Sequence, residues 1–175
     1  MSFSLYLATV PGYQQMLGAV RGLLDKAEAH CKEKGQDPAA LIQAKLAPDM
    51  LPFAYQIKST AVHSIGAIEG LRKGVFSPDR TTPPVDFDGL RAKVSAASEA
   101  LAQIKPAELD GFMGRDMRFE IGDYRLEFTA ENFLLSFSQP NFYFHVTTAY
   151  DILRWQGVNL GKRDYLGTPR VKPKA

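Results

Sequence analysis

The chain lacks several features that would identify its class at once. It contains a single cysteine, Cys31, so no intramolecular disulfide can form. The first residues lack the basic stretch, the apolar run and the cleavage site of a secretory signal. No apolar run approaches the roughly 18 residues that a membrane span needs, because charges or prolines interrupt each one. These absences predict a cytoplasmic protein that is not integral to a membrane.

Charge of one sign is also scarce. The formal net charge is +2, and it includes Arg170, Lys172 and Lys174 in a proline-containing tail. No predicted helix concentrates basic residues on one face, as a nucleic-acid binder would. We therefore expect no nucleic-acid partner. We interpret residues 1–168 as one domain, which at this length buries about 70% of its unfolded surface, and 169–175 as a disordered basic tail.

Apolar residues that recur every three or four positions predict an all-α fold with four long helices. Thr9 is the expected cap of the first helix and Gly35 its left-handed end, while Pro140 predicts a kink in the fourth. The fourth helix is apolar nearly all round, Phe144 included, so we expect it to be the most buried. The long helices are expected over residues 10–34, 48–73, 87–104 and 130–156, with a short helix over 38–45. Amphipathic helices joined by modest loops favour a four-helix bundle.

A β-hairpin is predicted between the third and fourth helices. Apolar and charged residues alternate over 117–121 and again over 124–128, and Gly122-Asp123 supplies a two-residue turn. If Ile121 faces Tyr124, Glu120 lies opposite Arg125 and Arg118 lies opposite Glu127. One face of the hairpin is then apolar and must cover the bundle or a partner subunit.

Polar residues stand where a bundle normally buries leucines. On the fourth helix, Asn141, His145 and Thr148 occupy the middle of a face whose two ends are apolar. Buried polar groups need hydrogen-bond partners, so these residues should meet polar side chains on a neighbouring helix. The second helix carries a matching row beside its apolar stripe: Asp49, Gln56, Thr60 and His63. The two rows predict a polar ligand pocket between the second and fourth helices.

Two segments resemble a known family. Residues 141–167 (NFYFHVTTAYDILRWQGVNLGKRDYLG) and 46–56 (LAPDMLPFAYQ), together with Asp25-Lys26, are similar to an uncharacterised bacterial branch of the DinB-like (YfiT-like) superfamily. The resemblance implies a four-helix bundle that is often a homodimer. Several superfamily members bind a divalent metal through one His of the second helix and a His-x-x-x-His pair on the fourth. Some transfer or isomerise small molecules with a low-molecular-weight thiol as cosubstrate.

The superfamily's metal pattern matches only in part. Its second fourth-helix histidine falls on His145, but its first falls on Asn141, and the branch often has histidine where Trp155 stands. The second-helix ligand would lie near Asp49 or Gln56, where the chain has no histidine. A complete three-histidine site therefore cannot be assembled from matching positions. Zinc or nickel could still be held by His145, Asp49 and His63, with water completing the coordination.

Several of these residues also have ordinary structural interpretations. His145 bonded to an acid or amide would be an ordinary satisfied core histidine, and His30 suits the negative end of the first helix dipole. The turn from Gly161 to Asp164 is interpreted as a docking turn and not a phosphate site. Three hypotheses remain open: a bundle that binds an unknown small molecule, a metal- or thiol-dependent transferase or isomerase, and a structural homodimer module without a site.

Overall fold

The first long helix, α1 (Leu5–Lys34), begins one turn earlier than the sequence pattern predicts. In this computed structural model, which describes residues 3–172, Ser4 caps the helix by accepting a hydrogen bond from the Leu7 N–H. Thr9, the expected cap, lies inside the helix and donates to the Leu5 carbonyl. The predicted end is confirmed, because Gly35 adopts the left-handed conformation at φ 62°.

The second helical segment starts later than predicted. The short helix α2 (Pro38–Ile42), capped by Asp37, is followed by a loop that continues to Pro52. The segment then consists of α3 (Phe53–Ala61), a π-helical turn η1 (Val62–Gly66) and α4 (Ala67–Lys73). Pro52 disfavours helical backbone in the residue before it, which explains why the helix cannot begin at Pro48.

The fourth helical segment also contains a π-helical turn. It runs through α7 (Ala130–Asn132), η2 (Phe133–Ser138) and α8 (Gln139–Trp155), and Pro140 lies in the first turn of α8. The disturbance predicted at Pro140 thus coincides with a change of helix type just before it. The helix predicted to be the most buried exposes two of its large side chains, since Phe144 and Trp155 are 54% and 76% exposed.

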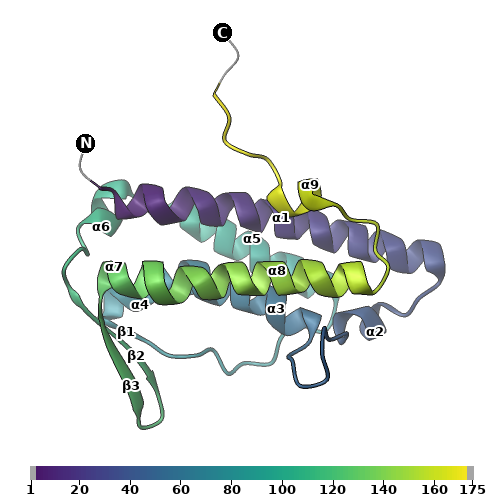
Figure 1. Cartoon of the computed structure of the whole chain (residues 1–175), viewed down its shortest axis with the longest axis horizontal. Coiled ribbons are helices and arrows are strands. Elements are labelled where there is room, and N and C mark those ends of the chain that lie inside the picture. The colour runs from purple at the N-terminus through teal and green to yellow at the C-terminus, as the bar shows by residue number, and fades with distance from the viewer. Residues whose placement is uncertain (1–2, 173–175) are drawn as a thin grey trace.

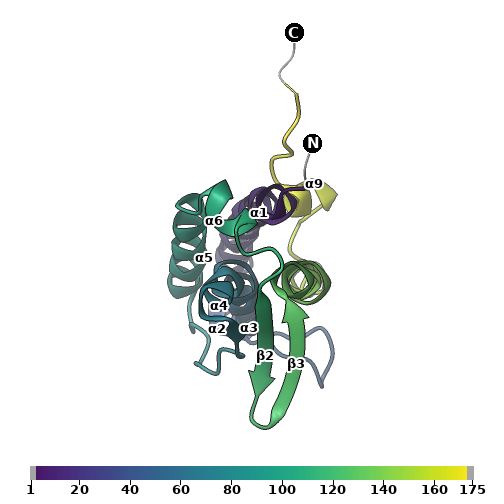
Figure 2. The same cartoon turned by 90° about the vertical axis from the view of Figure 1, so that its left-hand side faces the viewer.

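The helical segments pack alongside one another, with α1 and α3 each contacting both α5 (Phe87–Ala102) and α8 (Figures 1 and 2). Asp86 caps α5 by accepting from the Gly89 N–H. Short helices α6 (Pro106–Asp110) and α9 (Lys162–Leu166) contact α1. Within residues 3–172, no helix is both long and apolar enough to cross a membrane.

The C-terminal turn docks onto the first helix, as interpreted from the sequence. Lys26 of α1 forms an ion pair with Asp164 at 2.6 Å, and Gln15 donates to the Leu166 carbonyl. The hydroxyls of Tyr165 and Thr147 lie 3.0 Å apart, which joins α9 to α8. Beyond this turn, residues 169–172 are exposed and form no helix or strand, and the rest of the predicted tail lies outside the described residues.

A small three-stranded sheet projects from one end of the helices (Figure 2). Its order is β1 (Val75–Phe76), β2 (Asp116–Ile121) and β3 (Tyr124–Thr129); β1 runs parallel to β2, and β3 runs antiparallel. The predicted register is confirmed, since Ile121 pairs with Tyr124. One expected ion pair changes partner, because Arg118 bonds Glu120 on its own strand at 2.9 Å.

The apolar face of the hairpin covers the helices near their irregular turns. Met117 is buried, and the ring of Phe119 lies 4.9 Å from the ring of Phe137 in η2. Phe76 of β1, which the sequence pattern did not predict to be in a strand, packs 5.5 Å from the ring of His63. The sheet therefore forms one wall of the region where η1 and η2 meet.

Two helical glycines test how tightly β1 packs. Gly22→Ala should raise the free energy of unfolding by about 1 kcal/mol, because an exposed helical alanine outperforms glycine and a Cβ there contacts nothing within 4 Å. Gly70→Ala should lower it, since that Cβ would lie 3.1 Å from the Phe76 Cβ and 3.2 Å from the Met117 Cε. Urea denaturation measures both variants, and equal stabilisation would contradict the close packing of β1 on α4.

Candidate functional site

A cavity of about 290 Å³ lies between the α3–η1 and η2–α8 segments, and we call it the imidazole cavity because His63 and His145 both line it. Its other walls come from the residues after β1 and from β2. The remaining lining is aromatic, apolar and polar in turn: Tyr55, Phe76, Phe119 and Phe137; Leu51, Val62 and Pro78; Lys58, Ser59, Asp79 and Asn141.

His145 is held in one tautomer by Gln56. Its Nδ1 lies 2.7 Å from the Gln56 Oε1 in a buried contact. The Gln56 Nε2 donates to the Leu51 carbonyl at 2.8 Å, which fixes the amide with its oxygen toward the imidazole. The Nδ1 of His145 therefore carries the hydrogen and donates it, and its Nε2 is left as an acceptor.

His63 is held in the same tautomer by Ser138. The Ser138 hydroxyl donates its one hydrogen to the carbonyl of His63 at 3.1 Å. The same oxygen lies 3.3 Å from the His63 Nδ1, so it can only accept there, and Nδ1 carries the hydrogen. The imidazoles of His63 and His145 stack, with centroids 5.5 Å apart and planes inclined by 22°.

Burial keeps both imidazoles uncharged. Burial, with a smaller contribution from the charge of His145, lowers the pKa of His63 to about 3. Burial also lowers the pKa of His145 to about 4. At neutral pH each ring is therefore a neutral group with one hydrogen on Nδ1 and a lone pair on Nε2.

The two π-helical turns meet at this point. His63 belongs to η1 and Ser138 ends η2, and the hydrogen bond from the Ser138 hydroxyl to the His63 carbonyl joins them directly. The side chain of Asn141, in the first turn of α8, donates to the carbonyl of Phe137 in η2. π-helical turns are rare and occur frequently at functional sites, so their pairing beside a cavity makes this region a candidate site.

Lys58 makes buried contacts that the sequence pattern did not predict. It is only 2% exposed, and its Nζ donates to the carbonyls of Asp79 and Thr81, each at 2.7 Å. The Nζ also lies 3.6 Å from the Asp79 carboxylate. These contacts fasten residues 77–84, which we call the strap, across α3. The available signal was that Lys58 is the only Lys, Arg, Asp or Glu between Asp49 and Glu69.

Asp79 organises the strap from the other side. Its carboxylate accepts hydrogen bonds from the Thr81 N–H at 2.8 Å and the Thr81 hydroxyl at 2.6 Å. Burial favours the neutral acid, but these bonds and the charges of Lys58 and Lys93 outweigh it and hold the pKa of Asp79 below its usual value. Asp79 is therefore ionised at neutral pH.

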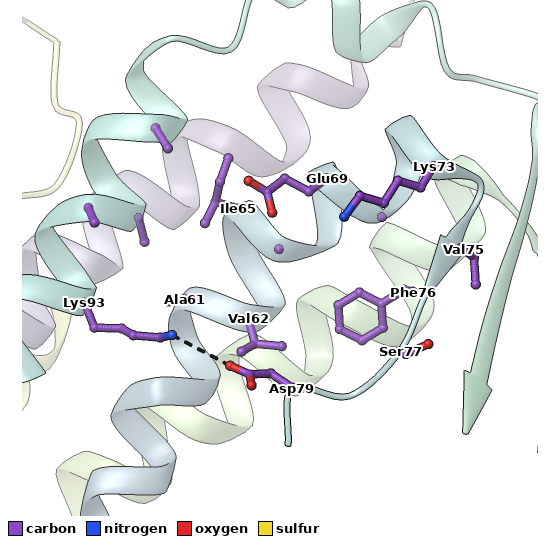
Figure 3. A pocket seen from close by; sticks show the side chains of 15 residues that line it. Ala61, Val62, Ile65, Glu69, Lys73, Val75, Phe76, Ser77, Asp79 and Lys93 are labelled. Carbon is purple, nitrogen blue, oxygen red and sulfur yellow. Dashed lines mark ion pairs between the residues drawn. The ribbon is translucent and has the colours of Figure 1, made fainter. Parts of the chain in front are cut away.

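A second, more open groove of about 450 Å³ lies on the other side of the strap, between α4 and α5 (Figure 3). Its lining includes alanines of α5, the glycines Gly66 and Gly70, and the Lys93–Asp79 ion pair at 3.7 Å. Val62, Phe76 and Asp79 line both spaces. The larger groove contains no histidine, so we place the candidate site in the imidazole cavity.

Comparison with known proteins identifies the family. Residues 5–166 match the family described as "Domain of unknown function (DUF1993)". The chain is a DUF1993 domain. It is also similar to the crystal structure of a DinB family member protein from Shewanella denitrificans, with a TM-score of 0.81, 27% sequence identity, and coverage of 97% of this chain and 96% of that one. No curated protein matches the chain.

The DUF1993 domain brings together only part of the predicted site. His63, Asn141 and His145 line the cavity, and Gln56 supports it from behind. Thr60 and Thr148 are buried but do not line the cavity, and the Thr60 hydroxyl is spent on the Ile57 carbonyl. The placement of Asp49 was wrong, because the helix begins at Phe53 and leaves Asp49 exposed in the preceding loop.

The predicted metal set is not assembled in this DUF1993 domain. Among the described residues 3–172, no three side chains of His, Cys, Asp or Glu converge as a metal site requires. Of the proposed ligands His145, Asp49 and His63, only the two histidines are neighbours. The match to the DinB-like metal pattern is thus reduced to two imidazole nitrogens, with Asn141 on the same wall.

The buried imidazoles of the DUF1993 domain should make its stability depend on pH. An unfolded histidine has a pKa near 6.5, so above that pH neither state binds a proton at these sites. Below it, these two histidines bind protons in the unfolded chain, whereas in the folded chain they bind them only near pH 3 to 4. The free energy of unfolding should therefore fall by roughly 1 kcal/mol per pH unit for each histidine between pH 6 and pH 4.

Urea denaturation at several pH values measures this slope. His63→Phe should remove one histidine's share of it, because phenylalanine binds no proton in either state. His30→Phe changes a histidine outside the cavity and serves as the matched control. A slope that His63→Phe leaves unchanged would contradict the burial of a neutral His63.

The strap should open when Lys58 loses its charge. Lys58→Met keeps most of the buried aliphatic chain but removes three contacts to Asp79 and Thr81. Arg80 is exposed within the strap, so trypsin should cut after it at least about tenfold faster than in the wild type. Lys93→Met loses only the 3.7 Å contact to the same carboxylate, so trypsin should cut it much more slowly than it cuts Lys58→Met. Equal rates in all three proteins would rule out Lys58 as the fastener.

Proposed function

We propose that this DUF1993 domain binds a small molecule in the imidazole cavity. The observation that carries the proposal is a pair of neutral, stacked imidazoles whose Nδ1 atoms are held by the protein while both rings line a partly open cavity. Ligand sites in proteins combine apolar walls with a few fixed polar groups, and their volumes begin at about 300 Å³. The cavity has this composition and lies at the small end of that range.

The cost of building the site supports the same function. A neutral buried histidine, a buried lysine and two π-helical turns are each less stable choices than apolar residues on regular helices. They occur together around one cavity, where a structural module would gain more from leucine. We infer that the polar interior serves binding and not packing alone.

A metal- or thiol-dependent transferase or isomerase is the second candidate. The neighbouring imidazoles of His63 and His145 favour it, because neutral imidazole nitrogens are preferred zinc and nickel ligands. Two nitrogens leave further positions for water or substrate. The DinB family likeness of the Shewanella denitrificans protein supports looking for such activity.

Two finer features of the architecture belong to the same proposal. We propose that the four helical segments form the four-helix bundle of DinB-like proteins, with the hairpin inserted between the third and fourth. The homodimer implied by the family resemblance would find apolar surface on the exposed side of α8, at Phe144 and Trp155.

A screen of small fragments by thermal shift tests the binding function. Leu51→Trp places a large ring at the rim of the cavity. Because Leu51 is half exposed, the substitution can be made without loss of core packing. Leu7→Trp is the matched control at an exposed position on α1. Fragments that raise the melting temperature of the wild type and of Leu7→Trp should lose at least about tenfold in affinity for Leu51→Trp. A screen whose hits bind Leu51→Trp equally well would place the ligand elsewhere.

A further inference from the structure

The imidazole cavity presents hydrogen-bond acceptors. Both Nδ1 hydrogens are donated within the protein, to Gln56 and Ser138, so the two Nε2 lone pairs remain as acceptors. Among residues 3–172, the only buried side-chain nitrogen or oxygen atoms without a hydrogen bond are the hydroxyls of Tyr13 and Thr129. The Nε2 atoms of His63 and His145 are not among these buried atoms and have no hydrogen-bond partner in the same residues, so each keeps some accessible surface, and both imidazoles line the cavity.

The only lysine or arginine in the cavity lining, Lys58, is already engaged. Lys58 spends two N–H groups on the carbonyls of Asp79 and Thr81 and lies beside the Asp79 carboxylate. Asn141 donates an amide hydrogen to the Phe137 carbonyl. An anionic ligand would therefore meet lone pairs and a carboxylate without a free cation, which is unfavourable in a desolvated site.

The charge balance and the walls limit the ligand further. Lys58 and Asp79 neutralise each other within the lining, so a bound cation would have no unpaired carboxylate. Phe76, Phe119 and Phe137 present ring surfaces that favour a flat partner. A volume of about 290 Å³ suits a molecule of one or two rings.

We propose that the ligand is a flat, uncharged nitrogen heterocycle that donates N–H hydrogen bonds to the Nε2 atoms of His63 and His145. This inference rests on the proposed function and names the chemical class that the cavity recognises. The aromatic walls contact the faces of the ring, and the paired imidazoles accept hydrogen bonds from the N–H groups on its edge. An analogue without those hydrogens leaves buried lone pairs unpaired, which costs affinity.

A graded series of probes tests the inference on the full chain. Benzimidazol-2-one carries two N–H donors, its 1-methyl derivative carries one, and its 1,3-dimethyl derivative carries none, while all three are flat and uncharged. Isothermal titration at pH 7.5 should show a loss of about tenfold in affinity for each hydrogen replaced. Benzoate, an anion of similar size, should bind more weakly than any of them.

Variants assign the contact to a residue. His63→Phe keeps the backbone carbonyl that accepts from Ser138 and removes one Nε2, so it should weaken benzimidazol-2-one about tenfold and leave the dimethyl derivative unchanged. His30→Phe, outside the cavity, should alter neither. Circular dichroism melts confirm that each variant is folded.

The outcomes separate the two proposals. Equal affinity across the methylated series, or tighter binding of benzoate, would overturn the donor inference. The proposed binding function would still hold in that case if Leu51→Trp weakened the binding of the fragments. Zinc binding that excludes all three probes would also overturn it, in favour of the metal-dependent alternative. No saturable binding by any probe or fragment would overturn both.

Discussion

The site depends on one hydrogen bond, from the Ser138 hydroxyl to the His63 carbonyl. It joins two π-helical turns on separate helical segments, and the same oxygen selects the His63 tautomer. In a regular α-helix the carbonyl of His63 would be engaged along its own helix. Here that carbonyl also accepts from the serine hydroxyl, which links the second and fourth helical segments beside the cavity.

Local patterns predicted the parts of the fold that short-range chemistry decides. The hairpin register follows from alternation and from a two-residue turn, and shifting it would expose Met117 and Phe119. The link between the second and fourth helical segments was also predictable, because Gln56 belongs to a polar row on one segment and His145 to the polar middle of a face on the other. Their hydrogen bond at 2.7 Å is the partner that burial of either one requires.

The sequence could not reveal features that tertiary contacts decide. Helical periodicity assumes a constant 3.6 residues per turn, so η1 and η2 shift every position that follows them and bring His63 opposite Ser138. Asp49 was misplaced because Pro52 delays the helix. The contacts of Lys58 were not predicted, since nothing local indicates that carbonyls of Asp79 and Thr81, more than 20 positions away, accept its hydrogen bonds.

The family likeness and the cavity give complementary information. The DUF1993 match and the DinB-like neighbour account for the overall architecture, since both extend over nearly the whole chain. Yet helical folds host many unrelated sites, so the likeness does not decide the chemistry. Asn141 stands at the position where the resemblance expects a metal-binding histidine, and its amide is spent on the Phe137 carbonyl. The local contacts thus point away from a copied metal centre.

One wall separates the imidazole cavity from the groove beside α5, and Val62, Phe76 and Asp79 contribute to both of its sides. Because Asp79 also anchors the strap, the partition is polar at one edge and apolar at the other. The two compartments on either side have volumes of about 290 and 450 Å³. A substitution at any of these three residues therefore alters the walls of both compartments at once.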